Sequence, residues 1–151
     1  MDKSKRPNVG IGIFMFDTSK TKFLIGKRKK ENVFGLPGGA LEFGEELNES
    51  AKREIFEETN VKILDEKTIE YISSFNVVRK ELNYHWYNVI MKVDLTEEHM
   101  INIKNNEEDK CEGWVWFSFE DLMNHWSELF YSLQDFVLKY KIKSIDDIRK
   151  I

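Results

Sequence analysis

Apolar residues along the chain fall into short blocks separated by turns, and the blocks predict strands interleaved with a few helices. The predicted strands cover residues 9–16, 22–27, 68–79, 84–94 and 112–117. The first two are joined by a turn at residues 17–21 and form a hairpin. Residues 95–110 are polar and acidic, and predict a loop with one short ordered piece. Such an alternation favours a mixed sheet between helical layers.

Two stretches have helical spacing. In the first, Leu47, Ala51 and Ile55 recur every four residues and so share one face. Gly44 is expected to open this helix, with two glutamates in its first turn. The second covers residues 129–140 and places its apolar residues on one side. Ser118 and Ser144 are predicted to cap two further short helices.

An acidic cluster lies on another face of the first helix. Glu54, Glu57 and Glu58 are spaced three and four residues apart, so their carboxylates are neighbours. An isolated glutamate pair on a helix is usually a solvated face. Three crowded carboxylates are better tolerated around a hard divalent cation such as Mg²⁺. Arg53 is expected to brace them through Glu49 or Glu57, since a guanidinium pairs with carboxylates.

A glycine-rich turn precedes the helix, in the sequence LPGG at residues 36–39. Paired glycines allow the backbone to approach a ligand closely and to direct peptide groups toward it. Gly38 and Gly39 are therefore candidates for contact with a ligand held by the acidic cluster. Arg28, at the end of the second predicted strand, is placed to meet a phosphate.

Turn and helix together resemble the signature of the Nudix hydrolases, G-x5-E-x7-R-E-U-x-E-E-x-G-U, where U is a bulky aliphatic residue. Eight of its nine specified positions match, as Gly39, Glu45, Arg53, Glu54, Ile55, Glu57, Glu58 and Val61. The late glycine is replaced by Asn60, which tolerates a left-handed helix end better than other non-glycine residues. The resemblance implies an α/β/α sandwich with a central mixed sheet. We expect a single domain over residues 9–151 after a flexible arm at residues 1–8.

The resemblance also implies a metal-dependent hydrolase that cleaves nucleoside diphosphate linkages. Mg²⁺, or Mn²⁺ in its place, would be held by Glu54, Glu57, Glu58 and the Gly38 carbonyl. Glu54 is our choice to orient or deprotonate the attacking water, with Arg53 beside it. One of Glu107, Glu108 and Glu112 would complete the site. The three histidines show no metal-ligand spacing and predict packing or surface positions.

Residues outside the signature resemble one branch of the family, the type 15 nucleotide triphosphate diphosphatases. The matching stretches are residues 6–12, 26–29, 36–45, 83–85, 91–92 and 110–112, followed by Trp114 and Trp116. In that branch the purine stacks against the start of the last helix. The matching positions here are Phe130, Tyr131, Ser132 and Leu133, with Leu36 lining the same pocket. Gly35 and Asn88 depart from the branch, so no particular base is predicted.

Composition restricts the partners. The 151 residues carry a net charge of −4, which argues against broad nonspecific binding to nucleic acid. Cys111 is the single cysteine and fits a reducing compartment, so we expect a cytoplasmic protein. The apolar run at residues 9–16 lacks a cleavage site, so no signal peptide is expected, and no segment reaches membrane-spanning length.

Three functions follow from this pattern. The first is a nucleoside triphosphate diphosphatase that releases a nucleoside monophosphate and pyrophosphate. The second is cleavage of capped RNA or of a dinucleotide such as ADP-ribose. The third is a nucleotide-binding module without catalysis, against which the retained glutamates argue. By resemblance to the type 15 branch, we also expect a homodimer, the commonest symmetry of soluble oligomers.

Overall fold

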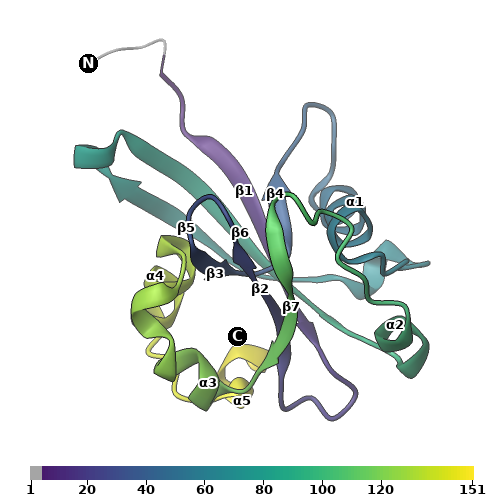
Figure 1. The fold of residues 1–151 in the computed structure, drawn as a ribbon. Helices are drawn as coiled ribbons and strands as arrows, with labels where there is room; N and C mark the ends of the chain where they lie inside the picture. The colour runs from purple at the N-terminus through teal and green to yellow at the C-terminus, as the bar shows by residue number, and fades with distance from the viewer. Residues whose placement is uncertain (1–4) are drawn as a thin grey trace.

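A seven-stranded sheet forms the centre of the protein (Figure 1) in a computed structural model that describes residues 5–151. The strands are β1 (Asn8–Phe16), β2 (Phe23–Arg28), β3 (Val33–Gly35), β4 (Gly38–Ala40), β5 (Glu70–Arg79), β6 (Tyr84–Asp94) and β7 (Cys111–Phe117). Their order is β3-β2-β1-β6-β5, and β4 pairs with β1 while β7 pairs with β2. Strands β1 and β6 run parallel and the other pairs antiparallel, so the sheet is mixed, as predicted.

Helices cover both faces of this sheet. They are α1 (Leu47–Thr59), α2 (Glu97–Ile101), α3 (Phe119–Asn124), α4 (Tyr131–Lys139) and α5 (Ile145–Arg149), with 3-10 turns η1 (Glu66–Thr68), η2 (Lys80–Leu82) and η3 (Trp126–Glu128). Helices α1 and α2 lie on one side and α3 to α5 on the other (Figure 1). The predicted α/β sandwich is confirmed. No helix within residues 5–151 is long and apolar enough to cross a bilayer.

Each face has its own hydrophobic core. Ala51 and Ile55 of α1 pack with Val89 and Met91 of β6 on one side. On the other side a run of aromatic rings from β1, β5 and α4 fills the space, with Phe14, Phe75 and Phe136 buried together. The alternation of strand residues between the two faces produces these cores.

The N-terminal half of the signature differs from its predicted shape. Residues 38–40 form the short strand β4 along β1, where a turn was expected. Helix α1 begins at Leu47, because Glu46 has extended backbone angles, so Gly44, Glu45 and Glu46 precede the helix. The C-terminal end is as predicted: Asn60 takes the left-handed conformation, with φ 66°, and its N–H donates to the Phe56 carbonyl.

Where the boundaries of the predicted strands and of the last long helix differ from the structure, they do so by one or two residues. Of the predicted arm, residues 1–4 lie outside the described residues, and Asn8 already belongs to β1. Ser118 and Ser144 cap α3 and α5 as predicted. The last long helix begins at Tyr131, because Leu129 bridges to Phe34 and the Phe130 N–H donates to the Phe34 carbonyl at 2.9 Å.

Candidate active site

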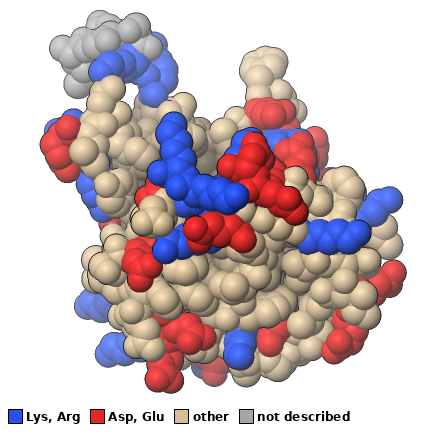
Figure 2. Space-filling model, in the orientation of Figure 1, with Lys and Arg blue, Asp and Glu red and all other residues tan. Residues whose placement is uncertain are grey.

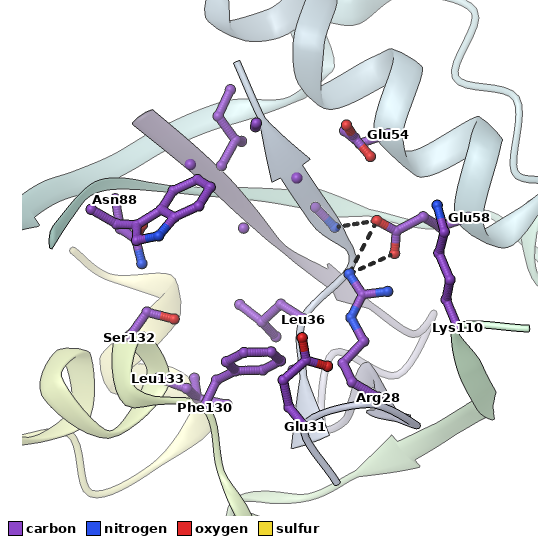
Figure 3. Close-up of a pocket in the computed structure, with 18 of the residues that line it drawn as sticks. Arg28, Glu31, Leu36, Glu54, Glu58, Asn88, Lys110, Phe130, Ser132 and Leu133 are labelled. Atoms are coloured by element: carbon purple, nitrogen blue, oxygen red, sulfur yellow. Dashed lines mark hydrogen bonds and ion pairs between the residues drawn. The ribbon is translucent and has the colours of Figure 1, made fainter. Parts of the chain in front are cut away.

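One cavity of about 820 Å³ brings the signature together with residues distant in sequence. Its walls come from β1, β4, β6, α1 and the start of α4, with the β2–β3 turn and the loop before β7 at the mouth. One end holds carboxylates and basic side chains, and the other is lined mainly by apolar groups (Figure 3). A cavity of this size and mixed lining suits a small organic ligand.

Arg53 organises the acidic end. Its Nε and Nη2 donate to the two Glu45 carboxylate oxygens at 2.7 and 2.9 Å, and Nη1 donates to Glu54 at 2.8 Å and to Glu57 at 3.3 Å. The hydrogen bond from Arg53 lowers the pKa of Glu45 to about 2. The predicted hydrogen bond of Arg53 with Glu57 is therefore present, whereas its second predicted partner, Glu49, is replaced by Glu45. Arg53 is thus held by a forked contact with Glu45 and orients the Glu54 carboxylate through one hydrogen bond from Nη1.

Glu58 is the most buried of the three clustered glutamates, at 2% exposure, while the side chain of Glu57 is half-exposed. Oε1 of Glu58 accepts a hydrogen bond from the Gly38 N–H at 3.3 Å. Nη2 of Arg28 lies 3.5 Å from each of the two Glu58 carboxylate oxygens. The second of these oxygens, Oε2, has no hydrogen-bond partner. Burial raises the pKa of Glu58 to about 8; Arg28 opposes the rise and the charge of Glu54 adds to it.

The two glycines allow β4 to lie close to β1 on one side and to Glu54 of α1 on the other. A Cβ at Gly38, where φ is +156°, would lie 1.9 Å from the Ile11 carbonyl oxygen. A Cβ at Gly39 would lie 2.4 Å from Oε1 of Glu54. Both positions therefore exclude side chains, one because of backbone and the other because of the glutamate.

The acidic end fits a divalent cation by its chemistry. No group of three or more carboxylate, histidine or cysteine side chains already converges as a metal site within residues 5–151. The buried Oε2 of Glu58 nevertheless accepts no hydrogen bond, although Arg28 lies 3.5 Å away, and Glu54 faces the same cavity. Hard cations prefer such oxygen ligands. Of the three candidate loop acids, only Glu107 lines the cavity, and it does so together with Asp109.

The apolar end contains most of the predicted nucleoside pocket. Leu36, Phe130, Ser132 and Leu133 line it, and the packing shows why glycine occupies position 35. A Cβ at Gly35 would lie 2.5 Å from the Phe130 ring, so glycine makes room for that ring.

Tyr131 does not line the cavity. It is the first residue of α4, and its ring meets that of Tyr84 edge-on, with centroids 5.6 Å apart. The Arg79 guanidinium lies 4.8 Å from the centre of the same ring. Tyr131 therefore contacts Arg79 and Tyr84 outside the cavity, while 36% of the residue remains exposed to solvent.

Sequence reasoning missed Tyr84 and Trp86 as cavity residues, and it singled out Asn88 only as a departure from the type 15 branch. Tyr84, Trp86 and Asn88 line the cavity from β6, where alternate residues point to one face. The side-chain amide of Asn88 has no hydrogen-bond partner within the described residues, which leaves its donor and acceptor available. The period-two spacing of these residues was the available signal, but it does not say which face meets the ligand.

Basic residues gather at the mouth of the cavity. Arg28, Lys30 and Lys110 line it beside the acidic loop, and Lys110 pairs with Glu107 at 3.1 Å. On the face shown in Figure 2, acidic and basic side chains are interleaved across the centre. The histidines lie elsewhere: none of His85, His99 and His125 lines the cavity.

Comparison with known proteins identifies the family. A family model described as the NUDIX domain matches residues 6–136. An RNA pyrophosphohydrolase of Pasteurella multocida is 29% identical over 129 residues, covering 76% of this chain and 62% of that protein. A mouse protein named nucleoside diphosphate-linked moiety X motif 6 is 43% identical over 56 residues, covering 36% of this chain and 18% of that protein. The chain thus spans less than two thirds of either relative.

Solved structures agree in fold. A MutT protein from Methanosarcina mazei superposes with a TM-score of 0.72 at 18% identity, covering 97% of this chain and 99% of that one. The NUDIX domain of Shewanella oneidensis NrtR, solved with ADP ribose, gives a TM-score of 0.65 at 16% identity, covering 99% and 92%. At these identities the likeness concerns the fold.

Proposed function

The chain belongs to the NUDIX family, whose members hydrolyse phosphoanhydride bonds, and from this premise we propose that it is a nucleoside triphosphate diphosphatase. It would release a nucleoside monophosphate and pyrophosphate with Mg²⁺ or Mn²⁺ as cofactor. The carrying observation is a single cavity of about 820 Å³ with a charged end and an apolar end. One nucleotide fills such a space with its phosphates at the carboxylates and its base near Phe130.

The acidic end would do the chemistry. Glu54, Glu57, Glu58 and the Gly38 carbonyl would hold the metal, which supplies charge neutralisation and a lowered pKa for bound water. Glu54 would orient the attacking water or accept its proton, because its carboxylate is anchored by Arg53 at 2.8 Å and reaches the cavity. Arg28 would turn from Glu58 toward the phosphates, where a guanidinium binds two oxygens at once.

The apolar end would hold the nucleoside. Leu36, Phe130 and Leu133 offer apolar surface, and Ser132 adds a hydroxyl at the same wall (Figure 3). Together with the matched stretches outside the signature, this wall supports the type 15 branch as part of the proposal. The two-fold dimer is proposed from the resemblance to that branch alone. The amide of Asn88 would contact the base edge, so base preference should differ from relatives that carry threonine there.

A second substrate class is favoured by one comparison. The relative from Pasteurella multocida is an RNA pyrophosphohydrolase, which makes the 5′-triphosphate end of an RNA a candidate. Lys30 and Lys110 at the mouth could meet the next phosphates of such a chain. The bond cleaved would be the same, so only the substrate separates the two proposals.

The test is pyrophosphatase-coupled phosphate release with GTP, dGTP and a 5′-triphosphate RNA, run beside AMP formation from ADP-ribose. We expect turnover of the free triphosphates, lost on chelation of divalent ions and restored by Mg²⁺. Turnover of the RNA alone would move the assignment to the second class. Absence of turnover with all four substrates would contradict the proposed function.

A further inference from the structure

Four residues away from the carboxylate end connect the two walls of the nucleoside end of the cavity, which are formed by β6 and by the start of α4. Arg79 ends β5, Tyr84 begins β6 directly opposite it, and Tyr131 and Asp135 lie one turn apart on α4. We call Arg79, Tyr131 and Asp135 the clamp, and Tyr84 the wall residue it holds. Among these, only Tyr84 lines the cavity.

The contacts within the clamp are specific. Arg79 forms a forked ion pair with Asp135, with Nη2 to Oδ1 at 2.9 Å and Nη1 to Oδ2 at 3.2 Å. Its guanidinium also lies 4.8 Å from the Tyr131 ring centre, in the range of a cation–π contact. Arg79 therefore binds two side chains on the same face of α4, at positions i and i+4.

The clamp connects to the cavity from both sides. On α4, the neighbours of Tyr131 are Phe130 and Ser132, which line the cavity. On the sheet side, the Tyr131 ring packs edge-on against Tyr84, whose ring lies 6.4 Å from that of Trp86. A shift of α4 relative to the end of β5 and β6 would thus change the separation of the two cavity walls.

We propose that the clamp positions these walls and so sets the affinity of the nucleoside end for its ligand, an inference that rests on the proposed function. Arg79, Tyr131 and Asp135 act as positioning residues: they touch no substrate and hold those that would. The carboxylate end comes from α1 and β4, which the clamp does not contact, so the chemical step is left unaffected.

The chain offers a matched control. Arg149 forms a forked pair with Asp94, at 2.5 and 3.1 Å, and lies 4.7 Å from the centre of the Phe16 ring. This pair repeats the chemistry of the clamp, but neither residue lines the cavity. Arg149→Met therefore removes an equivalent set of contacts without moving the nucleoside walls.

The experiment compares Arg79→Met with Arg149→Met in the full chain. Isothermal calorimetry gives the Kd of AMP, GMP, CMP and UMP, steady-state kinetics give kcat and KM, and thermal melting gives Tm. We expect Arg79→Met to weaken the tightest-bound monophosphate about 2- to 30-fold, the range found for residues that couple through packing. KM should rise with little change in kcat. Arg149→Met should lower Tm and leave the Kd unchanged.

Each outcome is decisive. Equal Kd values for the two variants would reduce the clamp to a stabilising contact and overturn the proposal. A fall in kcat without a change in Kd would also overturn it, since the effect would then lie in the chemical step. Absence of triphosphate turnover would disprove the proposed function. The proposal for the clamp would still be tested, because the Kd values of the two variants are measured without turnover. A wild-type chain that binds none of the four monophosphates would disprove the clamp.

Discussion

Gly39→Ala tests whether the position of the Glu54 carboxylate decides the reaction rate. The new Cβ would lie 2.4 Å from Glu54 Oε1, whereas ordinary contacts begin at 3.4 Å, so the carboxylate must retreat by about 1 Å. Gly39 is not one of the residues with positive φ, so alanine keeps the backbone of β4. A misplacement of about 1 Å costs roughly 10²-fold in rate, and we expect a loss of that order in kcat.

The assay is coupled phosphate release at saturating Mg²⁺, with thermal melting beside it. Gly44→Ala is the control: it strains a residue with φ +88° and has nothing within 4 Å, so it should cost about 1–2 kcal/mol of stability and leave kcat intact. The double variant of Gly39→Ala with Glu54→Gln should be no slower than Glu54→Gln alone, because both act through one carboxylate. Full activity in Gly39→Ala at an unchanged Tm would refute the reasoning.

The remaining predictions concern the buried glutamate, acid stability and assembly. Glu58→Gln should lower kcat by about 10–100-fold through weaker metal binding, and unchanged kcat at saturating Mg²⁺ would contradict the ligand assignment. The hydrogen bond with Arg149 lowers the pKa of Asp94, so the stability from this pair is present above the unfolded pKa and is lost as the pH falls through the folded one. Asp94→Asn should therefore flatten the acid side of the Tm–pH profile, and a parallel profile would speak against it. Light scattering should give a dimer, and a mass near 18.0 kDa at micromolar concentration would count against pairing.

The acidic half of the site could be predicted because its information is local. Glu54, Glu57 and Glu58 share one helix, and helical spacing alone places them together. The left-handed end at Asn60 is equally local, since it depends on one residue's backbone preference. Local spacing could not predict that Arg53 pairs with Glu45. Glu45 is eight residues away and outside the helix, so only the path of residues 40–46 brings it there.

The wall of β6 shows a different limit. Tyr84, Trp86 and Asn88 share one face of a strand whose limits were predicted correctly. Whether that face meets solvent, core or ligand depends on the parallel pairing with β1, which puts Asn88 opposite Gly10. A Cβ at Gly10 would lie 2.9 Å from the Asn88 amide oxygen, so the glycine leaves room for that amide. The order of the strands therefore decides that this face of β6 lines the cavity, and no single segment of the sequence specifies that order.

Tyr131 shows how a small boundary shift changes a role. A helix over residues 129–140 puts Tyr131 off the apolar stripe, where it would be free to stack on a base. The structure agrees that Tyr131 lies off the buried stripe of α4. Leu129 and Phe130 instead pair with Phe34 at the edge of the sheet, so the helix begins only at Tyr131. Phe130 then enters the cavity from the helix cap, and the off-stripe face of α4 meets Arg79. An aromatic residue off the core stripe therefore marks a second packing partner here, and the residue that lines the cavity is its neighbour Phe130.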